Sequence, residues 1–289
     1  MFERAEALFF ASWARLEAER CEAAEHLGLL LRLPPGRRAL LVRNSPRLRT
    51  WGVLERLIEA SRAQSKVDPV EADALAEFAL DLSDEIPQEA YPSIHLADLR
   101  ARAWSCRSRC LRVRGDLSAA EDALARAYRH LLAGSRDPGE RALYLEIKAE
   151  QRAAQERFGE ATSLLKRAVK VFVESGDEVR ACRCLSTLVR ISLGAGRRAV
   201  AARAAERAVE LVRPEDPALL ASALADLIAV RVASGDEVSA RRALAELALL
   251  DARHPGLPVP LPEIRRTVAT ARRLRSPAAP ADPKTRLLE

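Results

Sequence analysis

Apolar residues recur every three or four positions along most of this chain, which is the spacing of one face of an α-helix. The first such stretch covers residues 3–32 and predicts one long amphipathic helix or two, ended by Pro34-Pro35. A short helix through Ala39 to Leu41 follows. Ser45 can then cap, and Pro46 can begin, the next helix.

The same periodicity predicts ten further helices, arranged as five pairs in which a tight turn joins a first helix to a second. Asp, Gly and Pro residues separate the pairs, as expected where aspartate caps a helix and proline occupies a first turn. The expected pairs are 46–66 with 69–86, 93–114 with 117–133, 138–157 with 159–175, 177–194 with 197–213, and 217–234 with 236–252.

Prolines dominate the chain after His254. Pro255, Pro258, Pro260 and Pro262 predict an extended connection, followed by a final helix over 263–275 that can cover the open end of a helical stack. Residues 276–289 contain three prolines and few large apolar side chains, and we expect them to be disordered.

Short stretches of similar sequence occur at regular intervals along the predicted pairs. Each closes on an alanine, and the successive intervals between these alanines are 48, 41, 40 and 39 residues. A period of this size is typical of stacked helical repeats, in which each unit packs on its neighbours. The closing alanines are Ala72, Ala120, Ala161, Ala201 and Ala240.

Composition agrees with an all-helical array. Hydrophobic residues make up 48% of the chain and aromatic residues 4%, and no uncharged apolar run approaches the roughly 20 residues of a membrane-spanning helix. We therefore expect no membrane partner. Five cysteines, an odd number, and an N-terminus without a basic-then-apolar order favour a reducing, cytoplasmic location.

Within each pair, small residues also recur at a fixed spacing. Trp104 lies sixteen residues before Ala120, and Ala127 lies seven residues after it. The seven-residue spacing recurs in three other pairs, while in the fifth it joins Ala240 to Leu247. This arrangement resembles the tetratricopeptide repeat (TPR), in which small residues lie where two helices cross, although a period near 40 exceeds the usual 34.

The resemblance implies an all-α, right-handed superhelical TPR-like solenoid of about five helix pairs, with N-terminal capping helices and a C-terminal capping helix. The expected organisation is 1–45 as an N-terminal cap or dimerisation segment, 46–254 as the repeat array, 255–275 as the proline-rich connection and capping helix, and 276–289 as the tail. Long repeats of this kind resemble those of bacterial regulators and sensors.

In TPR arrays the first helix of each pair lines the concave groove, so its outward residues are the expected partner contacts. Carried over, these are Arg102, Arg109, Arg112, Glu146, Glu150, Arg183 and Arg190. Arginines beside carboxylates could bind an acidic or mixed-charge protein or peptide. The alternative is that these arginines and glutamates pair with one another across adjacent helices. The groove hypothesis predicts that reversing Arg109 and Arg190 to glutamate abolishes partner binding without loss of helicity.

No pattern in the chain indicates catalysis, a cofactor or a metal. The pairs Cys106 with Cys110 and Cys182 with Cys184 lie two repeats apart, which favours buried structural thiols over a zinc site. The four histidines are scattered, and there is no glycine-rich phosphate loop. We therefore expect a non-enzymatic protein without cofactors.

Three functions remain open from the sequence. The first is a protein–protein interaction scaffold that acts as an adaptor or regulatory subunit. The second is a peptide-responsive sensor part of a bacterial regulator. The third is a nucleic-acid-binding repeat protein, which the net charge of +6 suggests but the interleaving of 47 basic with 41 acidic residues opposes. The apolar residues Phe2, Leu8, Phe9 and Trp13 either cover the first repeat or form a homodimer contact.

Overall fold

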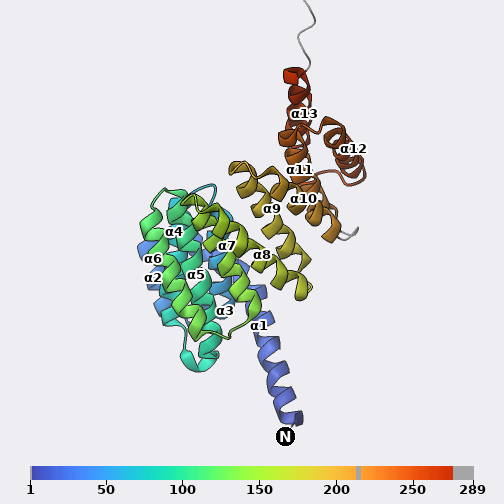
Figure 1. Cartoon of the computed structure of the whole chain (residues 1–289). Helices are drawn as coiled ribbons and strands as arrows, with labels where there is room; N and C mark the ends of the chain where they lie inside the picture. The colour runs from blue at the N-terminus through green and yellow to red at the C-terminus, as the bar shows by residue number, and fades with distance from the viewer. Residues whose placement is uncertain (1, 213–215, 276–289) are drawn as a thin grey trace, which may run out of the picture. The chain divides into compact units, whose positions relative to one another are not determined.

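The computed structural model describes residues 2–212 and 216–275, and it describes the side chains of residues 14–87, 89–212 and 216–270. This described part contains thirteen α-helices, two short 3-10 helices and no strand (Figure 1). The all-α class expected from the periodicity is confirmed. The expected tail, 276–289, lies outside the described residues, and so do the side chains of Phe2, Leu8, Phe9 and Trp13.

The chain forms two compact units, Met1–Arg157 and Phe158–Glu289. Unit 1 contains helices α1 to α7, and unit 2 contains α8 to α13. The boundary falls in the turn after α7, so the two helices of the expected third pair belong to different units.

Unit 1 begins with one long helix where the sequence allowed one or two. Its helices are α1 (Phe2–Leu31), α2 (Pro35–Asn44), α3 (Trp51–Gln64), α4 (Pro69–Glu85), α5 (Ser93–Val113), α6 (Leu117–Ala133) and α7 (Pro138–Ala154). Ser45 precedes a 3-10 helix, Pro46–Leu48, and its side chain makes no capping hydrogen bond. The cap of α3 is instead Thr50, whose side chain accepts a hydrogen bond from the Val53 amide.

The last turns of α1 pack against α3 and join the core of unit 1. Ala23 and Leu30 of α1 are buried together with Leu54 and Leu57 of α3. At Gly52 the two backbones approach so closely that a Cβ atom would lie 2.5 Å from the carbonyl oxygen of Glu19. Only glycine fits at this crossing, so the sequence of α3 fixes where α1 lies.

Unit 2 contains α8 (Phe158–Glu174), α9 (Glu178–Gly194), α10 (Arg198–Leu211), α11 (Pro217–Ser234), α12 (Glu237–Arg253) and α13 (Leu261–Arg275). Leu261 and Val268 of α13 are buried against the core formed by α11 and α12, while Arg265 and Arg266 are exposed. A helix that is apolar on one face and charged on the other suits the end of a repeat stack. The expected extended connection before α13 is wrong in detail, because Gly256 adopts a positive φ and residues 254–259 form turns and bends.

The alanines that define the repeat lie at the helix crossings. All five closing alanines are fully buried, and Ala79, Ala127, Ala168 and Ala208 are at most 1% exposed. Leu247, the exception in the fifth pair, is also fully buried. Within each unit, small side chains at these positions allow neighbouring helices to pack closely.

Helix α11 is the one described helix that is long and apolar enough to cross a membrane by length and composition. Within unit 2 it contacts α9, α10, α12 and α13. The apolar composition of α11 fits these several packing contacts.

Glu156 occupies the turn position at which other repeats have glycine. Glu156 lies five residues before Ala161. Gly115, Gly196 and Gly235 likewise lie five residues before the closing alanines of their repeats. The φ of Glu156 is 61°. A left-handed conformation strains a residue that has a Cβ atom. We expect Glu156→Gly to raise the free energy of unfolding by about 0.5–1 kcal/mol.

Urea unfolding followed by circular dichroism measures this difference. Gly115→Glu, the reverse exchange at the equivalent position, serves as the control and should destabilise the protein. Equal stability of wild type and Glu156→Gly would show that the turn carries no strain.

Candidate functional site

The sequence placed the partner contacts on the first helix of each pair. In unit 1 these helices are α3, α5 and α7, and in unit 2 they are α9 and α11. We call the surface that they form in each unit the first-helix surface of that unit. The structure gives the two surfaces different chemistry.

In unit 1 the arginines of this surface pair with glutamates of neighbouring first helices. Arg102 of α5 donates to Glu140 of α7 over 2.8 Å through Nε, and a second guanidinium nitrogen contacts the same carboxylate. The guanidinium of Arg102 also lies 3.9 Å from Glu55 of α3. Arg102 therefore links three successive first helices.

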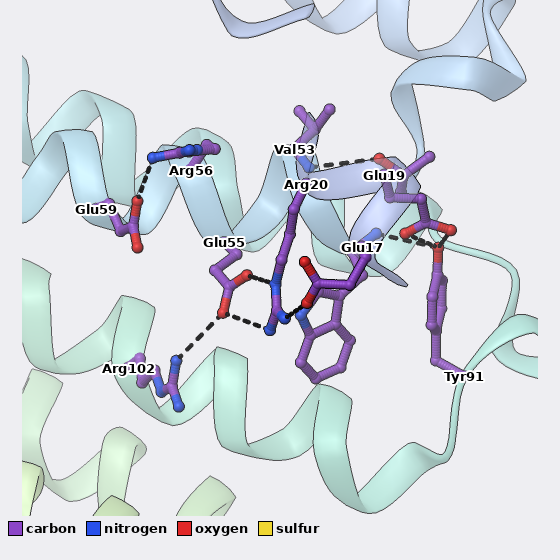
Figure 2. Close-up of polar contacts among 11 residues, drawn as sticks. Glu17, Glu19, Arg20, Val53, Glu55, Arg56, Glu59, Tyr91 and Arg102 are labelled. Carbon is purple, nitrogen blue, oxygen red and sulfur yellow. Dashed lines mark hydrogen bonds and ion pairs between the residues drawn. The ribbon is translucent and has the colours of Figure 1, made fainter. Parts of the chain in front are cut away.

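The same row of charges continues into α1. Arg20 of α1 donates to Glu55 over 2.8 Å, and another of its nitrogens donates to Glu17 over 2.8 Å. Figure 2 shows Arg20 between these two carboxylates, with Arg102 on the other side of Glu55. Positive and negative side chains thus alternate from α1 to α7 in the order Glu17, Arg20, Glu55, Arg102, Glu140.

A second cluster lies further along α5 and α7. Glu150 is 7% exposed, and its Oε2 atom lies 2.8 Å from Arg112 and 3.5 Å from Arg109. Burial lowers the pKa of Arg109, but the charges of Glu150 and Glu146 outweigh burial and leave this pKa above its usual value. Glu150 is thus the shared counter-charge of two largely buried arginines.

The alternative left open by the sequence, pairing across adjacent helices, therefore describes Arg102, Arg109, Arg112 and Glu150. Their ion pairs link α5 to α3 and α7. Replacing Arg109 with glutamate would place a second carboxylate against Glu150. We therefore expect this change to disturb the structure as well as binding, so Arg109 is not a suitable position for testing the groove hypothesis. Glu146, the remaining predicted residue of unit 1, is half-buried on α7.

In unit 2 the predicted residues Arg183 and Arg190 are both exposed on α9. Between them, Ser186 donates a hydrogen bond to Asp226 of α11. Burial raises the pKa of Asp226, while Ser186 and the charge of Arg190 oppose that rise. Among the described residues Arg183 has no ion-pair partner, so its guanidinium faces solvent.

The buried cysteines agree with a structural role. Cys106, Cys110, Cys182 and Cys184 are buried, free thiols. Burial raises the pKa of Cys110 to about 12 and that of Cys182 to about 11, which keeps both protonated and poorly nucleophilic. The described residues contain no group of three or more histidine, cysteine or acidic side chains arranged to hold a metal.

Solved structures with a similar fold are TPR-like repeat proteins. BtubC (BKLC) from P. vanneervenii matches with a TM-score of 0.57 and 18% identity, over 83% of this chain and 92% of that chain. A putative kinesin light chain from Podosopora anserina with nearly identical TPR-like repeats matches with a TM-score of 0.51 and 17% identity, over 70% of this chain and 97% of that one. The chain has a TPR-like fold.

No family model matches the sequence, and no curated protein matches it. The solved structures therefore establish the TPR-like fold through three-dimensional similarity, at identities of 17% and 18%. This confirms the TPR-like repeat inferred from the alanine spacing.

Sequence reasoning missed Glu55 and Glu140, the partners of Arg102. A signal was present, because Arg102 with Glu140 and Arg112 with Glu150 are each 38 residues apart, close to the repeat period. Opposite charges separated by one period lie on equivalent turns of neighbouring first helices. No pattern in the sequence indicated the hydrogen bonds of Tyr91. Its hydroxyl donates to Glu19 over 2.7 Å and accepts from the Trp51 amide over 3.1 Å.

Proposed function

We propose that this protein is a non-enzymatic, cytoplasmic TPR-like scaffold that binds a protein or peptide and acts as an adaptor or regulatory subunit. The binding site is the first-helix surface of unit 2, and its contacts are Arg183 and Arg190. The partner segment is acidic or of mixed charge, because guanidinium groups bind carboxylates through paired hydrogen bonds.

The contrast between the two units carries this proposal. In unit 1 the arginines of the first-helix surface already have carboxylate partners, and Arg109 and Arg112 are 14% and 17% exposed. In unit 2 Arg183 is exposed without an ion-pair partner among the described residues. A partner that approaches α9 therefore need not break an existing ion pair of Arg183.

The TPR-like fold supports the same function. A stack of helix pairs offers a preformed surface, so the scaffold loses little conformational entropy when a partner binds. The described residues also lack a metal-binding group, and burial suppresses the reactivity of Cys110 and Cys182. These features favour binding over catalysis.

Partner capture from nuclease-treated lysate of the native host tests the proposal. The immobilised full chain is compared with the variant Arg183→Glu/Arg190→Gln, in which Arg190 becomes neutral so that no carboxylate faces Asp226. We expect proteins enriched on the wild type to be lost on this variant. Mass spectrometry identifies them.

Arg167→Glu/Arg203→Gln provides the matched control. It makes the same change of charge at exposed arginines of the second helices α8 and α10. Retention of the same proteins on both variants would contradict the proposal. A parallel capture from lysate without nuclease treatment tests the nucleic-acid alternative, and proteins enriched only from that untreated lysate would favour it.

A further inference from the structure

A cleft of about 480 Å³ lies in unit 2 between the beginnings of α9 and α11. One side is formed by the turn before α9 and its first residues, and the other by the first turn of α11. The cleft is lined by Ser175, Gly176, Asp177, Glu178, Val179, Asp216 and Leu219. Arg183 and Arg190 lie further along α9.

The lining of this cleft combines apolar side chains with carboxylates. Val179 is 42% exposed, and Leu219 is half-buried. The carboxylate of Asp177 caps α9 and lies 3.2 Å from Arg180, and that of Asp216 caps α11 by accepting from the Leu219 amide over 2.9 Å. Glu178 adds a third carboxylate. Because a carboxylate offers about four acceptor positions, Asp177 and Asp216 can each accept further hydrogen bonds.

This combination suits a lysine or arginine side chain. Its aliphatic stem can pack on Val179 and Leu219, while its charged end reaches the carboxylates. An acidic side chain placed in the cleft would instead face three carboxylates, which disfavours it.

Val179 of the cleft shares one face of α9 with the two exposed arginines. Val179, Arg183, Ser186 and Arg190 are spaced four, three and four residues apart, which places them on one side of the helix. At 1.5 Å per residue, Arg183 lies about 6 Å and Arg190 about 16 Å from Val179 along the helix axis. The surface is therefore acidic at the beginning of α9 and basic further along.

We propose that this surface binds an extended segment of a partner protein in which one basic residue enters the cleft and acidic residues follow on Arg183 and Arg190. At about 3.3 Å per extended residue, the acidic residues lie about two and about five positions from the basic one. This inference rests on the proposed function, and it adds the order of charges that the partner must have.

Selection of random peptides tests the inference without knowledge of the partner. A phage-displayed library of random 12-residue peptides is selected on the full chain, and the enriched sequences are synthesised with a fluorescent label. We expect enriched sequences to carry one lysine or arginine near two acidic residues at the spacing given above. Fluorescence polarisation then gives the dissociation constant for each protein variant.

Val179→Lys is the decisive variant, because it places the protein's own cation in the cleft at an exposed position. We expect it to weaken peptide binding about tenfold or more, the loss typical of one charge-assisted contact. The chain provides a matched control, since the sequence Gly-Asp-Glu-Val occurs both at 176–179 and at 235–238. Val238 is the second residue of α12, is 82% exposed and lines no part of the cleft, so Val238→Lys should leave the affinity unchanged.

Three results would overturn the inference. In the first result, peptides bind Val179→Lys as tightly as wild type but no longer bind Arg183→Glu/Arg190→Gln. This would exclude the cleft as a contact and leave the proposed function intact. Enriched peptides that are insensitive to both variants would contradict the inference and the proposed function together. If no sequence with the expected charges is enriched, the cleft proposal fails, while partner capture still decides the proposed function.

Discussion

Replacing Glu150 with glutamine is expected to lower the free energy of unfolding by about 3 kcal/mol. The glutamine keeps the size of the side chain but removes a charge whose Oε2 atom lies within 3.5 Å of both Arg109 and Arg112. Two largely buried guanidinium groups would then lose that counter-charge. Urea unfolding followed by circular dichroism measures the change.

Glu59→Gln is the matched control, because Glu59 makes the same kind of ion pair with Arg56 at the surface. The two side chains are 50% and 47% exposed, and such pairs contribute about 0–1 kcal/mol. A loss at Glu150 no larger than that at Glu59 would show that the buried cluster does not hold α5 and α7 together.

Replacing Gly52 with alanine is expected to destabilise unit 1 by about 2 kcal/mol. The new Cβ atom would lie 2.5 Å from the backbone oxygen and 2.7 Å from the backbone carbon of Glu19, and neither atom can move without shifting α1. A shift of α1 would also pull Glu19 away from the Tyr91 hydroxyl. Urea unfolding measures the loss, and hydrogen exchange over 14–31 reports the release of α1.

The control for this substitution lies in α1 itself. At Gly28 an added Cβ atom would meet nothing within 4 Å, so Gly28→Ala should stabilise the helix by about 0.5–1 kcal/mol. The two glycine-to-alanine changes are thus expected to have opposite signs. Similar stability of both variants would contradict the close packing of α1 on α3.

The repeat could be predicted from the sequence because it depends on local properties. The seven-residue spacing of alanines such as Ala120 and Ala127 can be read without knowing which helix they pack against. Helix propensity and capping residues mark the ends of each helix. The connection before α13 was harder. Its prolines restrict φ, but Gly256 is free to adopt the positive φ that turns the chain.

The candidate site was predictable only in outline. The sequence placed Arg102 and Arg183 on equivalent first helices, but it could not show that Glu140 reaches Arg102 while Arg183 has no ion-pair partner among the described residues. Such a difference depends on the register between neighbouring helices, which side-chain packing sets. The cleft beside Val179 has the same origin, because an identical Gly-Asp-Glu-Val sequence at α12 forms no part of it.

The central claim is that arginines of the first-helix surface stabilise unit 1 but bind a partner in unit 2. Partner capture on Arg183→Glu/Arg190→Gln, together with the urea midpoint of the same preparation, tests it most directly. We predict a midpoint close to that of the wild type and a loss of the proteins that the wild type enriches. An unchanged set of captured proteins at an unchanged midpoint would contradict the claim.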